Sequence, residues 1–194
     1  RKYMEALDYS RMVFLQSDFD EFSKKYGTLL DNLTKRGNVS PAFEIHKRYI
    51  SRLKTSHSWL EGIINKEFDF NIDETFTPDR TKTNWPKNEE EARNLWRKRI
   101  KYEVLGNRLS KRRSVEALKA SIKGAASIKK SDGTDVKIYN IKEEKDKILR
   151  RYERFLRVRN EMDSGDVLQY YLTALSNGYD PHSDYFSPRE AENF

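Results

Sequence analysis

Residues 40–64 read SPAFEIHKRYISRLKTSHSWLEGII and contain the most regular apolar repeat of the chain. Ser40 is suited to cap a helix, because its hydroxyl can accept a hydrogen bond from a free N–H of the first turn. Pro41 suits the first helical position, where its missing N–H is not needed. The pattern predicts a long helix with one buried face, formed by residues three or four positions apart: Ala42, Ile45, Tyr49, Leu53, Leu60, Ile63 and Ile64.

Further helices are predicted on both sides of this one. Asp18 is a candidate N-cap and Gly37 a candidate stop signal for the helix before it. After it, the acidic run at Glu89 suits a helix start, because negative charge complements a helix N-terminus. The predicted ranges are 18–37, 89–105, a weaker stretch at 114–127, 141–162, and a last helix that begins at Asp163 or Ser164 and ends at Gly178.

The helical pattern breaks between residues 67 and 87. Phe68, Phe70 and Ile72 alternate with polar residues, which favours a short extended segment followed by a loop. The predicted fold class is therefore mainly α: an irregular multi-helix array of about six helices with a short extended segment near residues 68–72, too uneven for a regular four-helix bundle. We expect the packing to be anchored by Trp59, Trp85 and Trp96, and the long helix to turn Ile148, Tyr152, Phe155 and Leu156 inward.

The composition agrees with a folded helical protein of one largish domain or two small ones. Hydrophobic and charged residues each make up 36% of the 194 residues, which suits helices with thin apolar stripes and solvated faces. The 11 Tyr, 10 Phe and 3 Trp argue against disorder, and 8 Gly and 5 Pro are too few for an all-β fold with many turns. Without cysteine there are no disulfides or thiolate metal sites, and no stretch resembles a signal peptide or a membrane span.

Three histidines are candidates for acid–base chemistry or metal binding: His46, His57 and His182. None of them has a second histidine or an acid at the spacing of a zinc helix such as HExxH. We therefore interpret all three as structural or surface residues. His182 lies in the polar segment Asp180–Asp184, which is typical of a turn whose side chains hydrogen-bond the backbone.

Two other candidate sites fail on chemistry. Ser127 and Lys129 are close in sequence, but a nucleophilic serine needs an oxyanion hole and a desolvated base, and this lysine lies in a polar run. Glu89, Glu90 and Glu91 are consecutive, so on a helix they point in different directions and cannot converge on a cation. The chain contains no GxGxxG and no P-loop. We therefore predict no catalytic, cofactor-binding or metal-binding residue and no cofactor.

The net charge of +7 is the strongest sign of a binding role, and the excess lies between Arg97 and Arg159. Arg150, Arg154 and Arg157 follow a four-three spacing, so they can form one face of the predicted helix. Such a face suits phosphate groups, but acidic residues interleave with it and can pair along the helix. We therefore argue against nucleic acid as a partner. Binding to an acidic protein surface or to anionic lipid headgroups requires the same positive field, so charge alone does not distinguish these partners.

The two ends suggest a piece of a longer protein. The first residues read as the middle or end of a helix, without an initiating Met. Near the other end, two prolines leave little room for regular structure, while Tyr185, Phe186 and Phe194 still need to be buried against something. We therefore predict a helical N-terminal domain at residues 1–178 and a connector at residues 179–194.

Several sequence blocks carry a family resemblance. The most specific are Phe14-Leu15-Gln16-Ser17-Asp18 and Asp180-Pro181-His182-Ser183, and the others are Leu7–Arg11, Ala42–Ile45, Phe68–Phe70 through Trp85, Leu95–Glu103 and Tyr185–Pro188. Together they resemble the N-terminal helical domain of bacterial tail-specific proteases, the carboxyl-terminal processing serine peptidases. The blocks occur in the family's order and cover most of the chain, with a weak match between residues 110 and 137.

The resemblance implies a role within a larger enzyme. In the family a PDZ domain that binds substrate tails follows this domain, and a protease core with a Ser/Lys dyad follows the PDZ domain. The parent is then a periplasmic serine endopeptidase that acts on proteins with accessible C-termini. This chain matches neither catalytic motif, so the resemblance implies a non-catalytic scaffold and docking domain. The implied partners are its own PDZ and protease domains, protein substrates and, in some members, a helical-repeat lipoprotein adaptor.

The alternative is a free-standing basic helical module that binds an acidic partner or nucleic acid. The C-terminal segment separates the two hypotheses. A self-sufficient module should cover Tyr185, Phe186 and Phe194, whereas a domain cut from a larger protein should leave some of them exposed.

Overall fold

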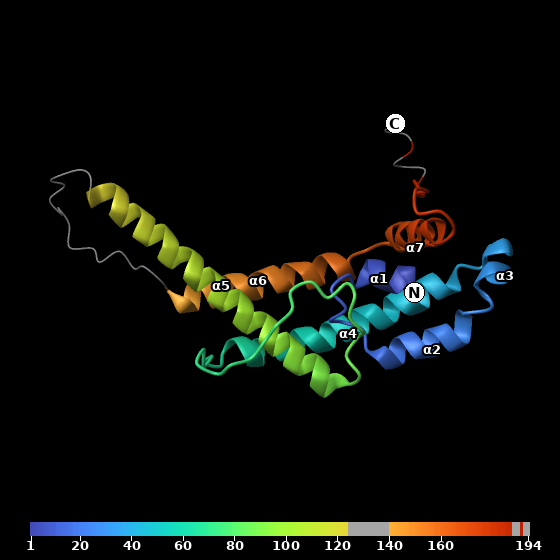
Figure 1. The fold of residues 1–194 in the computed structure, drawn as a ribbon. Helices are drawn as coiled ribbons and strands as arrows, with labels where there is room; N and C mark the ends of the chain where they lie inside the picture. Colours follow the sequence, from blue (N-terminus) through green and yellow to red (C-terminus); the bar gives the residue numbers. More distant parts are fainter. Residues whose placement is uncertain (124–139, 188–190, 192–194) are drawn as a thin grey trace.

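The computed structural model describes residues 1–123, 140–187 and 191, and within them it contains seven helices and no strand (Figure 1). The predicted mainly α class is confirmed. The helices are α1 (Lys2–Leu7), α2 (Gln16–Tyr26), α3 (Leu30–Lys35), α4 (Ser40–Ile64), α5 (Glu89–Lys123), α6 (Ile141–Asn160) and α7 (Ser164–Tyr179).

Helix α4 is the centre of the array, because it contacts α1, α2, α5, α6 and α7. Figure 1 shows it between α6 and α2, with the long α5 crossing it at an angle. The predicted apolar stripe of α4 is buried at every position, and the small side chain of Ser56 fills the gap between Leu53 and Leu60. A single local pattern therefore provides the surface on which the other helices pack.

The start of α4 lies one residue earlier than predicted. Ser40 is the first helical residue and Val39 is the N-cap, so the predicted Ser40 cap is wrong. The side-chain oxygen of Asn38 accepts the Ser40 N–H at 3.0 Å, so one of the first N–H groups of α4, which have no acceptor within the helix, is hydrogen-bonded. Pro41 lies in the first turn as predicted.

The predicted helix at residues 18–37 is wrong, because the chain forms two helices there. Helix α2 begins after Leu15 and ends at Gly27, and α3 follows as a separate short helix. Asp18 lies in the first turn of α2, where its carboxylate accepts the Leu15 N–H at 2.9 Å, and is not the N-cap. Gly37 adopts a φ of 69° after α3, the left-handed conformation that glycine favours at a helix end.

The predicted extended segment is also wrong. Phe68 is followed by a turn at residues 70–72, in which Asp69 accepts the backbone N–H of Asn71 at 2.9 Å. This Asx turn competes with strand formation, and no neighbouring strand is available to pair with the segment in the described part of the chain. The loop that continues to Trp85 packs its indole into the core.

Helix α5 is longer than predicted, since it runs without a break through the start of the expected weaker stretch to Lys123. The rest of that stretch lies outside the described residues. Helix α6 ends at Asn160, and Phe155 is 39% exposed, so its predicted inward orientation is wrong. Of the two predicted starts of the last helix, Asp163 and Ser164, it is Asp163 that caps α7, by accepting the Asp166 N–H at 2.8 Å.

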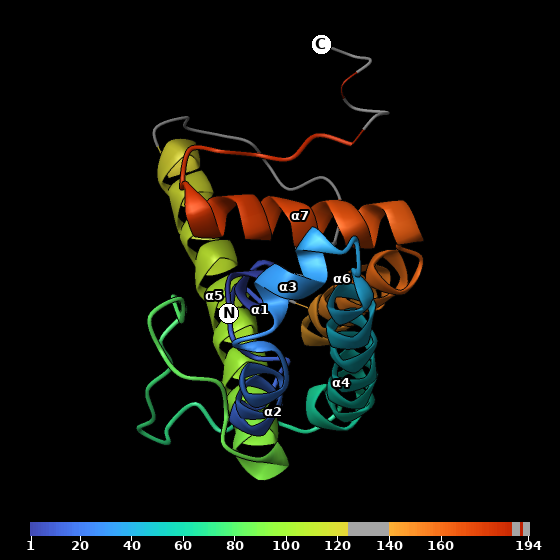
Figure 2. The ribbon, with the colours of Figure 1, turned by 90° about the vertical axis from the view of Figure 1, so that its right-hand side faces the viewer.

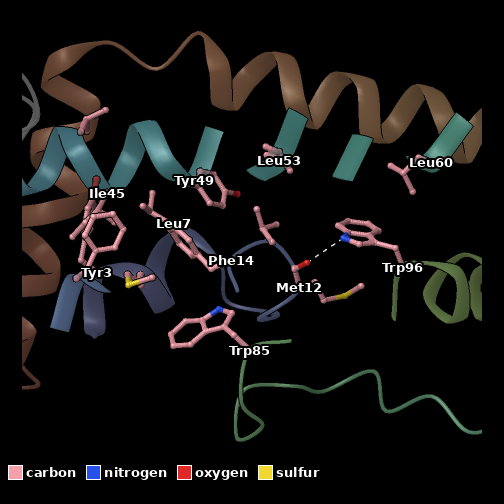
Figure 3. Packing of buried hydrophobic residues seen from close by; sticks show 14 of the residues in the cluster. Tyr3, Leu7, Met12, Phe14, Ile45, Tyr49, Leu53, Leu60, Trp85 and Trp96 are labelled. Carbon is pink, nitrogen blue, oxygen red and sulfur yellow. Dashed lines mark hydrogen bonds between the residues drawn. The ribbon is translucent and has the colours of Figure 1, made fainter. Parts of the chain in front are cut away.

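One hydrophobic cluster joins the helices (Figure 3). Trp85 and Trp96 are buried in it as predicted, and Trp59 packs against it half-buried. The indole Nε1 of Trp96 donates to the carbonyl oxygen of Met12 at 3.1 Å, so α5 is tied to the loop after α1. In the described residues, no helix combines the length and the apolar character that a membrane span requires.

Candidate functional site

The loop after α1 is organised by a buried carboxylate. Asp8 accepts the backbone N–H groups of Met12, Val13 and Phe14 at 3.0, 2.9 and 3.0 Å, and the indole Nε1 of Trp85 at 3.0 Å. Burial raises the pKa of Asp8, and these four hydrogen bonds act in the opposite direction. Both oxygens are engaged, so Asp8 clamps two distant loops together.

Arg11 adds a second link between the same loops. Its backbone is left-handed, with a φ of 50°, and its guanidinium is buried over the ring of Trp85. The guanidinium donates to the carbonyl oxygen of Thr83 and to the carboxylate of Glu5 at 2.7 Å. The unusual backbone is therefore held by contacts on three sides of the side chain.

A second carboxylate connects α2, α4 and α5. Asp18 is 1% exposed and accepts from Arg48 at 2.6 Å and from Arg52 at 2.9 and 3.1 Å. Burial opposes ionisation of Asp18, but the hydrogen bonds from Arg52, the Leu15 N–H and Arg48 outweigh it and lower the pKa. Arg52 also pairs with Glu89 at 2.9 Å, at the start of α5.

Two further glutamates fix α5 to its neighbours. Glu74 pairs with Arg97 at 2.5 Å and with Lys101 at 2.6 Å, which holds the loop before α5 against that helix. Glu103 likewise pairs with Arg99 of its own helix at 2.7 Å and with Arg151 of α6 at 2.5 Å. It also accepts a hydrogen bond from the hydroxyl of Tyr152 on α6 at 2.9 Å. These carboxylates act as acceptors between elements, which suits a rigid scaffold.

The histidines do not converge on a site. His46 and His57 lie on α4 with no hydrogen-bond partner for their buried Nε2 atoms in the described part of the chain. Burial, with a smaller contribution from the charge of Arg159, lowers the pKa of His46. His182 donates its backbone N–H to Asp180 at 3.0 Å, and Ser183 donates to the same carboxylate at 2.9 Å. The turn predicted around His182 is therefore confirmed.

The acidic run Glu89–Glu91 does not converge on one site either. Glu89 points to Arg52, whereas Glu91 accepts the backbone N–H of Lys87 at 3.0 Å, so the acidic run serves the start of α5. In the described residues no group of three or more His, Asp or Glu side chains could hold a metal ion. Ser127 and Lys129 lie outside the described residues.

The predicted arginine face of α6 is present. Arg150, Arg154 and Arg157 are exposed, and the Nε of Arg150 donates to the carbonyl oxygen of Asp146 at 3.3 Å. Asp146 and Glu153 are exposed on the same helix, so positive and negative charges alternate on its surface as the sequence indicates. This alternation lowers the field that a phosphate backbone would meet.

A groove lies between α1 and α7 beside the segment that leads away from α7. Its volume is about 660 Å³, and it is lined by Tyr9, Gln169, Asn177 and their neighbours on the two helices. The segment after α7 runs back along that helix (Figure 2). Thr173 donates to the carbonyl oxygen of Tyr185 at 3.3 Å, and Asn177 to the carboxylate of Asp184 at 3.1 Å.

The residues that organise this structure carry no distinctive signal in the sequence. Asp8 is the clearest case, because its only local signal is an acid placed directly after the apolar Leu7. Glu74 and Glu103 look like any surface acid in the sequence. Their partners in other segments lie 23 to 77 residues away, so no pattern within one helix could have found these contacts.

The chain is similar to known proteins over its whole length. The family model of the tail specific protease N-terminal domain matches residues 1–189, including the segment 110–137 where the motif resemblance is weak. Among curated proteins, a tail-specific protease from Haemophilus influenzae is 30% identical over 193 residues. That match covers 100% of this chain and 24% of the relative, so the chain spans a minor part of the relative's length.

Proposed function

The chain belongs to the tail-specific protease N-terminal domain family, and on that basis we propose that it is the non-catalytic scaffold and docking domain of a periplasmic serine endopeptidase that processes proteins from their C-termini. The observation that carries the proposal is the family match over residues 1–189. The relative named as a protease adds support for a proteolytic parent. The Ser/Lys dyad and the PDZ domain belong to the proposed remainder of that parent.

The scaffold role is supported by the way the charged side chains are used. Asp8, Asp18, Glu74 and Glu103 each join segments that are distant in sequence. Carboxylates held by several donors are poor general bases, because their hydrogen bonds favour the charged form that is already paired. A helical body held in this way can position neighbouring domains.

The docking role is supported by α7 and the segment that follows it. The proposed connector, residues 179–194, starts along α7, and Phe186 is 50% exposed there. An exposed ring in the connector, together with a groove of about 660 Å³ on the α7 surface, suits contact with a following PDZ domain. A helical-repeat lipoprotein adaptor and protein substrates are further proposed partners of the parent.

The test compares this chain with the full-length parent on a model protein that has a free apolar C-terminus. We expect the parent to cleave it, the isolated chain to leave it intact, and replacement of the proposed downstream serine by alanine to abolish cleavage. An inactive parent would contradict the protease assignment. The alternative, a basic binding module, would then be tested at Arg150, Arg154 and Arg157, which are exposed on α6.

A substitution on α7 tests the docking role separately. Asn177→Ala in the parent removes the hydrogen bond to Asp184 and should lower kcat/KM several-fold, because the connector is then less well placed. Asn107→Ala, on α5, is the matched control and should leave kcat/KM unchanged. Equal effects of the two substitutions would contradict a docking role for the α7 surface.

A further inference from the structure

A cavity of about 370 Å³ lies where α5, α6 and the loop after α1 meet. This volume falls in the range of about 300–1,000 Å³ that is usual for small-ligand pockets. Its apolar walls include Met12, Val13 and Phe155, and the exposed Tyr9 stands at its edge. Three arginines, Arg99, Arg151 and Arg159, also line it, and we call it the arginine pocket.

Two of the three arginines already have a carboxylate. Arg99 and Arg151 both pair with Glu103, at 2.7 and 2.5 Å. Asp8 also lines the pocket, but its oxygens are occupied by four N–H donors. In the described part of the chain, Arg159 has no carboxylate within ion-pair distance, so the pocket holds one cation without a counter-charge.

The guanidinium of Arg159 is held in place by aromatic rings. Its central carbon lies 5.4 Å from the ring centroid of Phe155 and 5.3 Å from that of Tyr170. Nη1 donates to the hydroxyl of Tyr170 at 3.1 Å and to the sulfur of Met162 at 3.8 Å. Because stacking covers the faces of the group, the remaining N–H donors at its edge are left for an acceptor, and a carboxylate matches that edge with two parallel hydrogen bonds.

A second observation at the same pocket points to a ligand. Tyr49 lines the pocket from α4 and is 1% exposed, and its hydroxyl makes no hydrogen bond within the described residues. Its ring is fixed against Phe14, with centroids 5.5 Å apart (Figure 3). The hydroxyl of this pocket-lining residue is a hydrogen-bond donor, so an acceptor bound in the pocket can take a hydrogen bond from it.

We propose that the arginine pocket binds the C-terminal residue of a peptide that ends in an apolar side chain. The terminal carboxylate takes the free edge of Arg159 and the hydroxyl of Tyr49, and the side chain lies against Met12, Val13 and Phe155. The apolar walls next to a single unpaired cation favour this ligand over inorganic phosphate, whose higher charge and hydration need several donors. The inference rests on the proposed function for its biological sense, since it adds a second place that recognises substrate C-termini, but its test needs no proteolysis.

The test is a fluorescence anisotropy titration of the 194-residue chain with a short polar peptide that carries a dye at its N-terminus and ends in leucine with a free carboxylate. We expect saturable binding, and a loss of affinity of about tenfold or more when the same peptide ends in an amide, because a charge-assisted hydrogen bond is lost. Equal binding of the acid and the amide, or no binding of either, would overturn the proposal.

Substitutions test whether the peptide binds in the arginine pocket. Arg159→Gln should weaken binding of the free acid by about tenfold, whereas Arg157→Gln, an exposed arginine on the same helix outside the pocket lining, should not. Tyr49→Phe removes only the unpartnered hydroxyl, so it should leave the melting temperature unchanged and still weaken binding a few-fold. Equal losses in the two arginine variants would indicate general charge attraction and overturn the assignment. Full affinity in a folded Tyr49→Phe chain would contradict the proposed contact between that hydroxyl and the peptide.

Discussion

The indole Nε1 of Trp85 donates a 3.0 Å hydrogen bond to Oδ2 of Asp8, across 77 residues of sequence. The bond joins the loop after α1 to the loop before α5, and both partners are buried. Asp8 also caps three backbone N–H groups of its own loop. One carboxylate therefore decides how two irregular segments meet in the core.

Removing that carboxylate should destabilise the domain strongly. Asp8→Ala leaves four buried donors without an acceptor, and each such donor costs about 1–3 kcal/mol, so we expect a loss of about 3 kcal/mol or more in the free energy of unfolding. Urea denaturation followed by circular dichroism measures it. Asp20→Ala, at an exposed position of α2, is the control and should change stability by less than about 0.5 kcal/mol. Similar values for both variants would contradict the clamp.

Trp96 should be more costly to truncate than Trp59. It is 5% exposed, it donates to the carbonyl oxygen of Met12 and its ring lies 5.4 Å from that of Tyr152. Trp96→Ala should lower the free energy of unfolding by about 3–5 kcal/mol, the usual cost of emptying such a site. Thermal melting of this variant beside Trp59→Ala, whose side chain is half-buried, measures the difference. An unchanged melting temperature for Trp96→Ala would contradict its anchoring role.

Glu74 should make stability depend on acidity. Hydrogen bonds from Arg97 and Lys101 lower the pKa of Glu74 from 4.5 to about 2. A lowered folded-state pKa stabilises the fold above the unfolded value, and the stabilisation is lost as the pH falls from 4.5 towards 2. Glu74→Gln should therefore cost about 1 kcal/mol at neutral pH, the modest value of a solvent-screened pair, and progressively less as the pH falls from 4.5 towards 2.

Chemical denaturation at several pH values, with the wild-type chain as reference, measures this dependence. Subtracting the two curves cancels the titration of all other groups that the substitution leaves unchanged. Glu67→Gln, at an exposed position of the same loop, is the matched control and should change stability by less than about 0.5 kcal/mol at neutral pH. A difference between wild type and Glu74→Gln that stays constant across the pH range would refute the pH dependence assigned to this ion pair.

Truncation tests the predicted boundary of the helical domain. The segment after α7 is tied to that helix by the hydrogen bonds of Thr173 and Asn177, and none of its described residues belongs to the buried core. A chain that ends at Tyr179 should therefore keep its helical spectrum, with a melting temperature within about 4 °C of the longer chain. Loss of the fold would show that residues 180–194 belong to the domain and are more than a connector.

Several errors in the sequence-based predictions have a common physical origin. Ser40 and Asp18 have the right chemistry for capping, but each lies in the first turn of its helix, because Val39 and Leu15 occupy the N-cap positions. At Asp69 a local hydrogen bond between side chain and backbone prevails over an alternating pattern that has no strand to pair with. Phe155 follows the apolar spacing of α6, yet the array leaves it at the edge of the arginine pocket. In each case the local signal was real and its surroundings decided the outcome.

The sequence alone determined the mainly α class, the buried stripe of α4, the Asp163 cap and the family resemblance. These properties depend on residues a few positions apart, because helix periodicity and capping are local. The tertiary structure alone decided the clamp at Asp8, the ion pairs of Glu74 and Glu103, and the pocket around Arg159. These contacts join residues from separate segments, and their energies depend on burial and on partners that only the folded chain brings together.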